Sequence, residues 1–541
     1  MPEISESTKK VIAEYAFWKD SLRPKPDVPT IHVDEVAMKV AAFYEKVRNV
    51  IDWREEHLMR RTGIIRKLKR RFLDLELNNF ATGKMAEPLV MEFIRGGYFP
   101  NDKIAESKIS EVQKIIEKYI FILRQSPVAK DGSANLQFYN QLLEIAACEI
   151  EETLEPSLKE ISMVDFMFGR MKEQIKINEN VYVAKALKKE AVDIQIYIAV
   201  QQALFKFDDP IISYNLIKYK FPEWEHTSED DLFKIAQSIH KILKDIEQDL
   251  NHPLGKKFYA ICEKYDTPYL LLSDILAREG SSPEKVTPII QEPATLEPLI
   301  RSAYLKRLGN LKIKIRRTAL YSTISIFVTK ILSLVVLELF LAWITRESSG
   351  LAYIVVDILI PTLLMALLIV TIKPPSKKNL NRVIVESIKI VYRREKNDAY
   401  EIKLSGKRGL MTRLTLTLMY LGTACVSFGL IIWVFLLLQF PYTSIAINLI
   451  FIALILFAGT AIRTRAKELT IEEETGGLLG FLSDVFFLPI TSLGRWLSNK
   501  WKRYNAVIVF FNVMIDMPFS AFVEFLERWR YFIQDRKEDL R

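Results

Sequence analysis

The stretch VTKILSLVVLELFLAW, residues 328–343, is apolar except for two charged residues, Lys330 and Glu338. It belongs to a longer apolar run at 320–344, which reaches the roughly 20 residues that a helix needs to cross the hydrocarbon core of a bilayer. Three further runs of similar length follow it, at 351–372, 414–439 and 443–462. Four such runs in succession are hard to bury in a soluble protein, so the sequence predicts four membrane-spanning helices.

The charges of the connecting segments predict how these helices are oriented. The connection at 373–413 holds twelve Lys or Arg residues against four acidic residues. Basic residues also precede the first run and follow the fourth, whereas the hairpins TRESSG (345–350) and FPYTS (440–444) carry no net charge. Because basic loops stay on the cytoplasmic side, the pattern predicts two transmembrane hairpins, 320–372 and 414–462, with both termini in the cytoplasm.

The predicted fold class is all-α. Residues 1–300 are rich in charged residues and favour helical over strand-like apolar spacing, which predicts a cytosolic helical domain. A basic juxtamembrane segment at 301–319 joins this domain to a four-helix transmembrane bundle. The basic cytosolic loop at 373–413 separates the two hairpins, and residues 463–541 are predicted to form C-terminal interfacial or re-entrant helices.

Several elements of the soluble parts are predicted in more detail. Within the basic loop, LNRVIVESIKIVYRRE (380–395) has the pattern of an amphipathic helix on the inner leaflet, and DAYEIKL (398–404) that of a short strand or extended segment. In the cytosolic domain, the stiff RPKPDVP segment at 23–29 follows a short helix, and loops are expected at 126–135 and 278–288. Helices are predicted at 102–125, 136–155, 157–176, 179–206, 228–250 and 254–279.

A long amphipathic pattern at 34–75 predicts a helical hairpin or a coiled coil, because apolar residues recur at seven-residue spacing. Its carboxyl-terminal part contains RRTGIIRKLKRR (60–71), a cluster of basic residues that is expected to contact anionic lipid headgroups, to bind nucleic acid phosphates or to form a solvated face. Of the two binding interpretations, lipid contact is favoured because the chain is predicted to be tethered to a membrane. The seven basic residues are Arg60, Arg61, Arg66, Lys67, Lys69, Arg70 and Arg71.

Three charged residues form a candidate polar site within the membrane: Lys330, Glu338 and Asp357. If both helices of the first hairpin are regular, Glu338 and Asp357 lie at the same depth, ~14 Å below its tip. In one interpretation the two carboxylates share a proton or hold a cation, because like charges at close range cannot both stay ionised. In the other, each acid is neutral or bonded to a neighbouring helix, and Lys330 extends its ammonium toward the inner headgroups.

Small and polar residues in the second hairpin suggest helix packing. Gly422 and Gly429 in the third run are expected to let another helix approach closely, and Asn448 in the fourth run to form a hydrogen bond across that same interface.

The C-terminal segment is apolar but interrupted by charged residues and prolines. Its tryptophans stand beside basic residues, a mixture typical of a membrane interface. Two in-plane or re-entrant helices are expected, with two additional full spans as the alternative. The candidate interface anchors are Trp496, Trp501 and Trp529.

The sequence carries no catalytic signature. The three cysteines, Cys148, Cys262 and Cys425, are far apart, and no close histidine pair or glycine-rich phosphate-binding motif is present. We therefore expect no cofactor, no metal and no enzymatic activity. The net charge of +9 suits contact with anionic lipid, and nucleic acid is not expected as a partner.

Two segments resemble an uncharacterised family of bacterial multi-pass membrane proteins. They are HVDEVAMKVAAFYEKVRNVIDWREEHLMRRTGIIRKLKRR (32–71) and FFLPITSLGRWLSNKW…MPFSAFVEFLERW (486–529). The resemblance implies a location in a bacterial cytoplasmic membrane, and it implies no activity, cofactor or functional residue.

Two functions are consistent with these observations. The first is a membrane-anchored interaction or scaffold protein, whose cytosolic helices bind a protein partner or a second copy of the chain. The second is a channel or transporter that uses Glu338 and Asp357 to move protons or cations, with Lys330 as a counter-charge.

Overall fold

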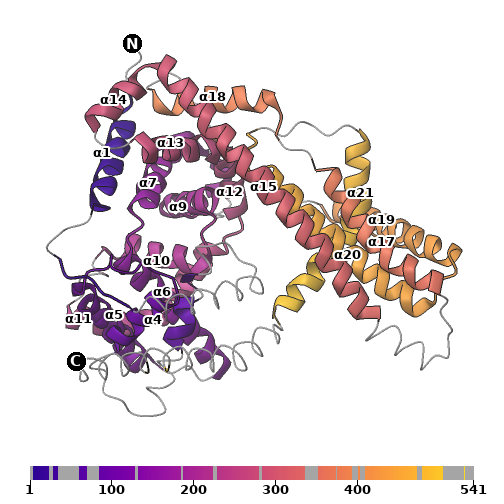
Figure 1. Cartoon of the computed structure of the whole chain (residues 1–541), viewed down its shortest axis with the longest axis horizontal. Coiled ribbons are helices and arrows are strands. Elements are labelled where there is room, and N and C mark those ends of the chain that lie inside the picture. Colours follow the sequence, from indigo (N-terminus) through magenta and orange to yellow (C-terminus); the bar gives the residue numbers. More distant parts are fainter. Residues whose placement is uncertain are drawn as a thin grey trace, which may run out of the picture.

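The structure is a computed structural model, and almost all of its regular elements are helices, so the all-α prediction is confirmed. Figure 1 shows a larger helical domain joined by one long helix, α15, to a smaller helix bundle. The residues described are 4–23, 28–33, 60–61, 63–69, 85–127, 132–183, 187–222, 224, 228–279, 283–334, 351–372, 375–392, 400–402, 409–471, 478–503, 525 and 529.

The larger domain contains two hydrophobic cores. One core lies among α4, α5, α6, α10 and α11, and the other is formed by α1, α7, α9, α12 and α13 together with parts of α15 and α18. The helices of this domain are α1 (Glu6–Ser21), α4 (Ala86–Arg95), α5 (Ser107–Gln125), α6 (Gly132–Leu154), α7 (Leu158–Gln174), α8 (Glu179–Val183), α9 (Lys189–Phe205), α10 (Asp209–Lys220), α11 (Glu229–Leu250), α12 (Gly255–Lys264), α13 (Asp266–Glu279) and α14 (Pro283–Gln291).

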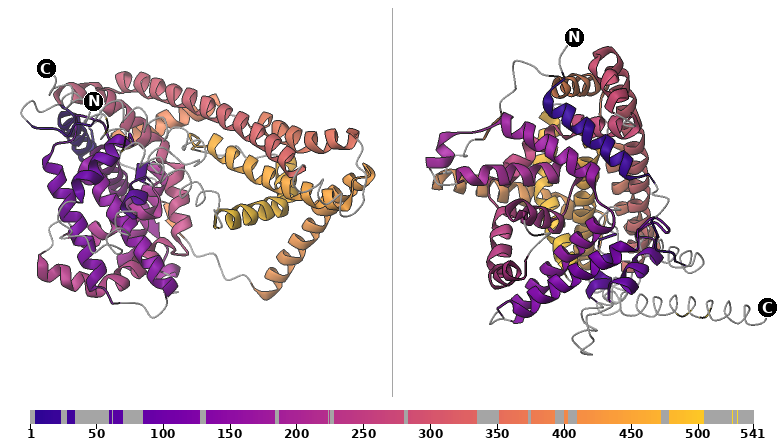
Figure 2. Two further views of the ribbon diagram at one scale, coloured as in Figure 1. Left: turned by 60° about the horizontal axis from the view of Figure 1, so that its bottom comes forward. Right: turned by 90° about the vertical axis from the view of Figure 1, so that its left-hand side faces the viewer.

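The helix α15 (Pro293–Ser333) belongs to both parts of the molecule. It has 41 residues, which makes it about 60 Å long at 1.5 Å per residue. Its amino-terminal half buries Leu296, Ile300 and Tyr304 in the domain core, and its carboxyl-terminal half buries Lys330 in the bundle. The predicted juxtamembrane segment and the start of the first apolar run therefore form one uninterrupted helix, which extends from the domain along the bundle in Figure 2.

The bundle consists of the end of α15 and four further helices, of which α17 and α20 contact α15. The four helices are α17 (Leu351–Val370), α19 (Leu410–Leu437), α20 (Tyr442–Ala466) and α21 (Leu478–Arg503). Helix α17 packs between α15 and α20, whereas α21 packs against α20 and α19. By length and composition, α19 and α20 qualify as candidate membrane spans, and Val355–Val370 is a shorter apolar segment of α17.

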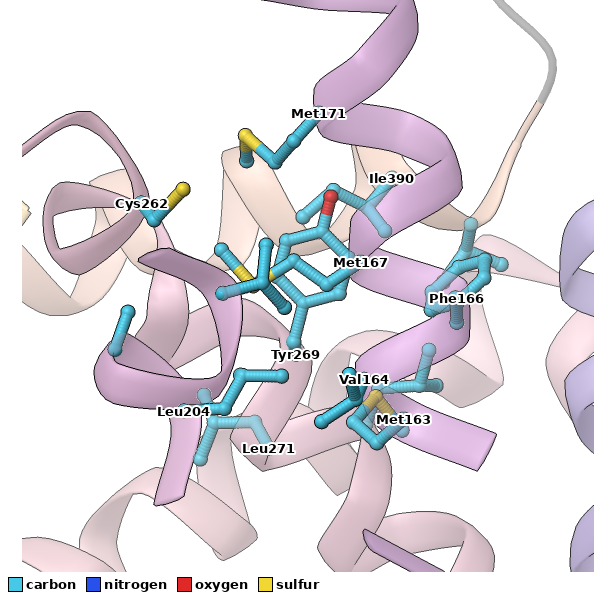
Figure 3. Close-up of a cluster of buried hydrophobic side chains, with 14 of the residues drawn as sticks. Met163, Val164, Phe166, Met167, Met171, Leu204, Cys262, Tyr269, Leu271 and Ile390 are labelled. Carbon is cyan, nitrogen blue, oxygen red and sulfur yellow. The ribbon is translucent and has the colours of Figure 1, made fainter. Parts of the chain in front are cut away.

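The predicted inner loop is part of the larger domain. Its amphipathic helix exists as α18 (Lys377–Val391), but the apolar face packs on α13 and α15, so the predicted position flat on a membrane surface is wrong. Figure 3 shows Ile390 of this helix beside Met167 and Tyr269 of the domain core. The predicted short strand is confirmed as β2 (Tyr400–Ile402), which pairs in parallel with β1 (Ile175–Ile177).

Most predicted helices of the domain are present, with differences at their ends. The helix predicted at 179–206 is two helices, α8 and α9, and the one predicted at 254–279 is divided at Tyr265 into α12 and α13. Helices α4 and α10 were not predicted, and α14 occupies part of the predicted loop at 278–288. The long amphipathic pattern at 34–75 and its coiled coil lie outside the described residues, except for short helical pieces at 60–61 and 63–69.

Candidate functional site

Three polar side chains meet inside the bundle, one from each of three neighbouring helices. Lys330 is on α15, Asp357 on α17 and Asn448 on α20, and each side chain has no solvent-exposed surface. We call these three residues the polar cluster. The cluster forms because α17 packs between α15 and α20, so the inward faces of all three helices converge there.

The carboxylate of Asp357 is the centre of the polar cluster. Its Oδ2 lies 2.6 Å from Nζ of Lys330, and its Oδ1 accepts a hydrogen bond of 2.6 Å from Nδ2 of Asn448. The same Nδ2 also donates to the backbone carbonyl of Ser444 at 3.0 Å. The ammonium of Lys330 lies 5.4 Å from the centroid of the Phe451 ring, within the range of a cation–π contact. Both carboxylate oxygens of Asp357 are thus engaged by positively polarised groups.

The surroundings of the polar cluster make the pairing necessary. Phe451, whose ring contacts Lys330, packs in an apolar group with the buried Met365 of α17 and Ile455 of α20. A lone charge in such an environment costs several kcal/mol, whereas the opposite charges of Lys330 and Asp357 cancel each other. Pro361, four residues after Asp357, has no N–H and cannot donate the usual helical hydrogen bond to the carbonyl of Asp357.

This geometry tests the predictions made for the charged and polar residues of the apolar runs. The structure brings Lys330 and Asp357 together, so the interpretation that Lys330 extends toward the inner headgroups is wrong. Asp357 is bonded to neighbouring helices, as the second interpretation expected. Glu338 lies outside the described residues, and its pairing with Asp357 stays a prediction. Asn448 does form a hydrogen bond between helices, but it joins α20 to Asp357 of α17 and does not cross the interface with the third span, where it was predicted.

The close helix contact in the bundle lies at a glycine that the sequence analysis did not single out. A Cβ on Gly494 of α21 would lie 2.0 Å from the carbonyl oxygen of Ala453 in α20. By contrast, a Cβ on Gly422 or Gly429 would meet no described atom within 4 Å, so the close packing predicted at these two glycines is wrong for the described part of the bundle. Exposed glycines and packing glycines look alike in a sequence, because both occur in apolar runs.

Helix α21 runs antiparallel to α20. Asp484 lies 3.2 Å from Arg463 near the carboxyl end of α20, and Gly494 contacts Ala453 ten residues earlier in that helix. In addition, Ser427 of α19 donates to the carbonyl of Phe486 at 2.7 Å. The first C-terminal segment therefore lies within the bundle, and its in-plane, re-entrant or spanning position relative to a membrane stays a prediction.

The predicted interface tryptophans are described only in part. The side chains of Trp496 and Trp529 are 57% and 54% exposed. The side chain of Trp501 and most of the second C-terminal segment lie outside the described residues. A role of these tryptophans at a membrane interface stays a prediction.

The basic cluster at 60–71 faces the domain rather than solvent over its described part. Arg61 is 2% exposed and pairs with Glu151 and Asp208. Burial is the largest influence on the pKa of the Glu151 carboxyl and raises it, against the neighbouring arginines. Arg61 is thus a buried ion-pair residue here, which is inconsistent with the predicted lipid contact for this residue.

Its neighbours in the cluster are also held by internal contacts. Arg60 pairs with Glu155 at 2.6 Å, Lys67 pairs with Glu92 at 2.9 Å, and Arg66 donates to the hydroxyl of Tyr98. Lys69 is partly exposed, and Arg70 and Arg71 lie outside the described residues. Lipid contact by the outer part of the cluster stays a prediction.

The described residues contain no group of three or more His, Cys, Asp or Glu side chains that could hold a metal ion. Burial raises the pKa of the Cys148 thiol, and it raises the pKa of the Cys262 thiol to about 12. Both are therefore protonated at neutral pH and are poor nucleophiles.

No protein-family model, curated protein or solved structure matches this chain. The resemblance to bacterial multi-pass membrane proteins stays a prediction.

Proposed function

We propose that the chain is a membrane-anchored interaction protein, in which the helical domain is fixed to a membrane-embedded bundle. The observation that carries the proposal is the apolar surface of the bundle. In the apolar window of α19 only 11% of the residues are buried, although this part of the helix consists mostly of large apolar residues. Soluble proteins rarely leave an apolar patch of this extent exposed to water, and lipid is the solvent that suits it.

The same apolar surface continues over the neighbouring helices. Leu320, Phe327 and Leu332 are exposed on α15, and Leu363 and Leu367 on α17. Charged side chains become frequent again on α15 before Leu320 and on the chain after Ile462. This distribution supports a bilayer around the carboxyl-terminal half of α15, α17, α19 and α20.

Contacts at one end of the bundle support the two-hairpin arrangement. Asn379 of the inner loop donates to the hydroxyl of Tyr304 at 3.0 Å and to the carbonyl of Leu469 at 2.6 Å, and its Oδ1 accepts from the amide of Ile471. The loop, the domain and the segment after α20 therefore lie on one side. With the basic residues of the loop, this supports a cytoplasmic position for all three. The bacterial cytoplasmic membrane is proposed only from the resemblance of segments 32–71 and 486–529.

The state of the polar cluster favours anchoring over transport. Lys330 and Asp357 neutralise each other, and both are fully buried, so neither side chain offers a free charge to a passing ion. An ion pair of this kind selects one arrangement of the helices, because any other arrangement leaves a charge unpaired in an apolar environment.

Labelling of single cysteines tests the membrane part of the proposal. Cys148, Cys262 and Cys425 are replaced, and a new cysteine is placed either at Gln439 in the hairpin between α19 and α20 or at Lys389 in α18. In intact cells an impermeant maleimide is expected to label position 439 and to spare position 389. Labelling of both positions in intact cells, or a fully soluble chain without detergent, would contradict the proposal.

The interaction part requires a measurement of association by the full chain. Sedimentation in detergent or nanodiscs is expected to show a stable oligomer or a stoichiometric partner that copurifies. A chain that stays monomeric and partner-free over the accessible concentration range would argue against an interaction protein.

Transport through the bundle is the alternative function, and one observation favours it. Charged residues inside membrane helices often mark ion or proton pathways, and Oδ1 of Asn448 has no hydrogen-bond donor among the described residues. Flux of protons and monovalent cations into vesicles containing the wild type or Asp357→Asn decides between the two. The anchoring proposal expects no flux above protein-free vesicles, whereas flux that Asp357→Asn abolishes would establish transport.

A further inference from the structure

We propose that a cavity at the junction of the domain and the bundle binds a phosphate-bearing anion. The cavity has a volume of ≈ 600 Å³ and lies between α13, α15 and the turn that follows α20. Pockets that bind small molecules or headgroups usually measure about 300–1,000 Å³, so the volume suits a phosphorylated group of moderate size. It is separate from the polar cluster, which is buried deeper along α15.

One stripe of α15 supplies the basic lining. Lys306, Asn310 and Lys314 are four residues apart and exposed, so their side chains emerge on the same face of the helix. Lys306 and Lys314 are ~12 Å apart along the helix axis. Neither ammonium has an ion pair among the residues that the structure describes, whereas Ser302 and Asn310 add neutral hydrogen-bonding groups to the wall.

The acidic residues of the lining do not cancel this charge. Asp274 is held by Arg307, whose Nη2 donates to Asp274 Oδ1 at 2.9 Å and whose Nε makes a second contact with the same carboxylate. That pair is internally neutral and forms part of the wall. With Arg278 and the two lysines against Glu468, the remaining lining carries an excess of positive charge. A phosphate group presents several acceptor oxygens and fits such a site.

The position of the cavity favours a lipid headgroup as the source of the phosphate. This assignment rests on the membrane insertion proposed above. Beyond the isolated exposed Leu305 and Ile313, the continuous exposed apolar surface of α15 begins at Leu320, six residues or ~9 Å beyond Lys314. If α15 enters the bilayer there, Lys314 lies at the level of the headgroups on the cytoplasmic side. A free phosphorylated metabolite has the same chemistry and is the other possible source.

Other basic residues of α15 provide a matched control. Lys312 and Arg316 are exposed on the same helix but do not line the cavity. A surface that attracts anions only through its general charge would use these residues as much as Lys306 and Lys314. Specific binding in the cavity would depend on the lining residues Lys306 and Lys314 alone.

The test uses the full chain in nanodiscs of pure phosphatidylcholine. Binding of dioctanoyl phosphatidylglycerol and of inorganic phosphate is measured separately for the wild type, the pair K306Q/K314Q and the control pair K312Q/R316Q. With about 1 kcal/mol per charge near a membrane surface, the lining pair is expected to weaken saturable binding about 30-fold. The control pair is expected to change it less than about threefold.

The two probes identify the source of the phosphate. Saturable binding of the phospholipid alone assigns a lipid headgroup, and saturable binding of inorganic phosphate that competes with the phospholipid assigns a free phosphorylated ligand. Equal losses in the two double variants, or no saturable binding of either probe, would overturn the proposal. Extraction of the same protein with alkaline carbonate measures membrane insertion independently, so a failure of the anchoring proposal is recognised separately.

Discussion

The ion pair between Lys330 and Asp357 predicts a strong energetic coupling that a double-mutant cycle measures. At a separation of 2.6 Å, two unit charges attract each other by ~6 kcal/mol at an effective dielectric constant of about 20. Desolvation of both groups offsets most of this attraction, so the pair itself stabilises the fold only slightly. Loss of one partner, however, leaves the other charge buried and uncompensated.

The single variants Lys330→Met and Asp357→Leu are therefore expected to lower the free energy of unfolding by about 3–5 kcal/mol each. The double variant replaces both charges by apolar side chains of similar size and is expected to lose less than about 2 kcal/mol. Part of that loss reflects Nδ2 of Asn448, which keeps its bond to the carbonyl of Ser444 but loses the carboxylate. The resulting coupling energy between the two sites is at least about 4 kcal/mol.

Unfolding of the bundle by sodium dodecyl sulfate in mixed micelles provides the assay. Cys425 is exposed on α19, so an environment-sensitive dye on this residue reports on the bundle after Cys148 and Cys262 have been replaced by alanine. The exposed pair of Glu297 and Arg301 on α15 is the matched control, with an expected coupling below about 0.5 kcal/mol. A coupling between Lys330 and Asp357 no larger than that of the control would refute the reasoning.

Three further predictions address the packing of the bundle, the junction and the domain. Gly494→Ala is expected to cost at least about 2 kcal/mol in the same assay, because the new methyl group overlaps backbone of α20, whereas Gly422→Ala has open space and is expected to be neutral. Asn379→Ala is expected to speed hydrogen exchange of the Ile471 amide at least about tenfold, whereas Asn379→Asp keeps the acceptor and the protection; equal exchange in both variants would contradict the assigned bond. Burial raises the pKa of the Asp266 carboxyl to about 7, against a nearby lysine that lowers it; because the folded state then holds the proton more tightly than the unfolded state, stability falls as pH rises from about 4 to about 7. Asp266→Asn is therefore expected to raise the melting temperature relative to the wild type at pH 8 and to leave it unchanged at pH 4, and a pH-independent difference would contradict the raised pKa.

The sequence predicted the helical fold because apolar periodicity and length are local properties. Helices such as α5 and α11 have a continuous apolar stripe, and Ser228 caps α11 by accepting from the amide of Asp231. Helix α10 was missed although Pro210 stands at its start, because its few buried residues give only a weak periodic signal.

The role of the inner loop was not predictable from its pattern. An amphipathic helix with basic residues has the same sequence whether its apolar face meets lipid or protein. The contacts that decide the matter are long-range, such as the bond from Thr8 to the carbonyl of Val391 and the pairing of Ile175 with Tyr400. Nothing in a local window indicates that residues so far apart in the chain will meet.

The polar cluster allows a comparison between the depths predicted for Lys330 and Asp357 in the first predicted hairpin and their observed contact. Counted from the middle of the 345–350 hairpin, Lys330 is eight residues farther away than Asp357, which predicts an offset of ~12 Å along regular, symmetric helices. The observed separation of 2.6 Å between their charged atoms requires the long side chain of Lys330 to cover part of that offset and the packing of α15 against α17 to cover the rest. The register of α15 against α17 over the described residues therefore departs from the symmetric arrangement, whereas the pairing of Glu338 with Asp357 stays a prediction. Charge complementarity stabilises the observed register, because a carboxylate in an apolar bundle is stabilised by a nearby ammonium.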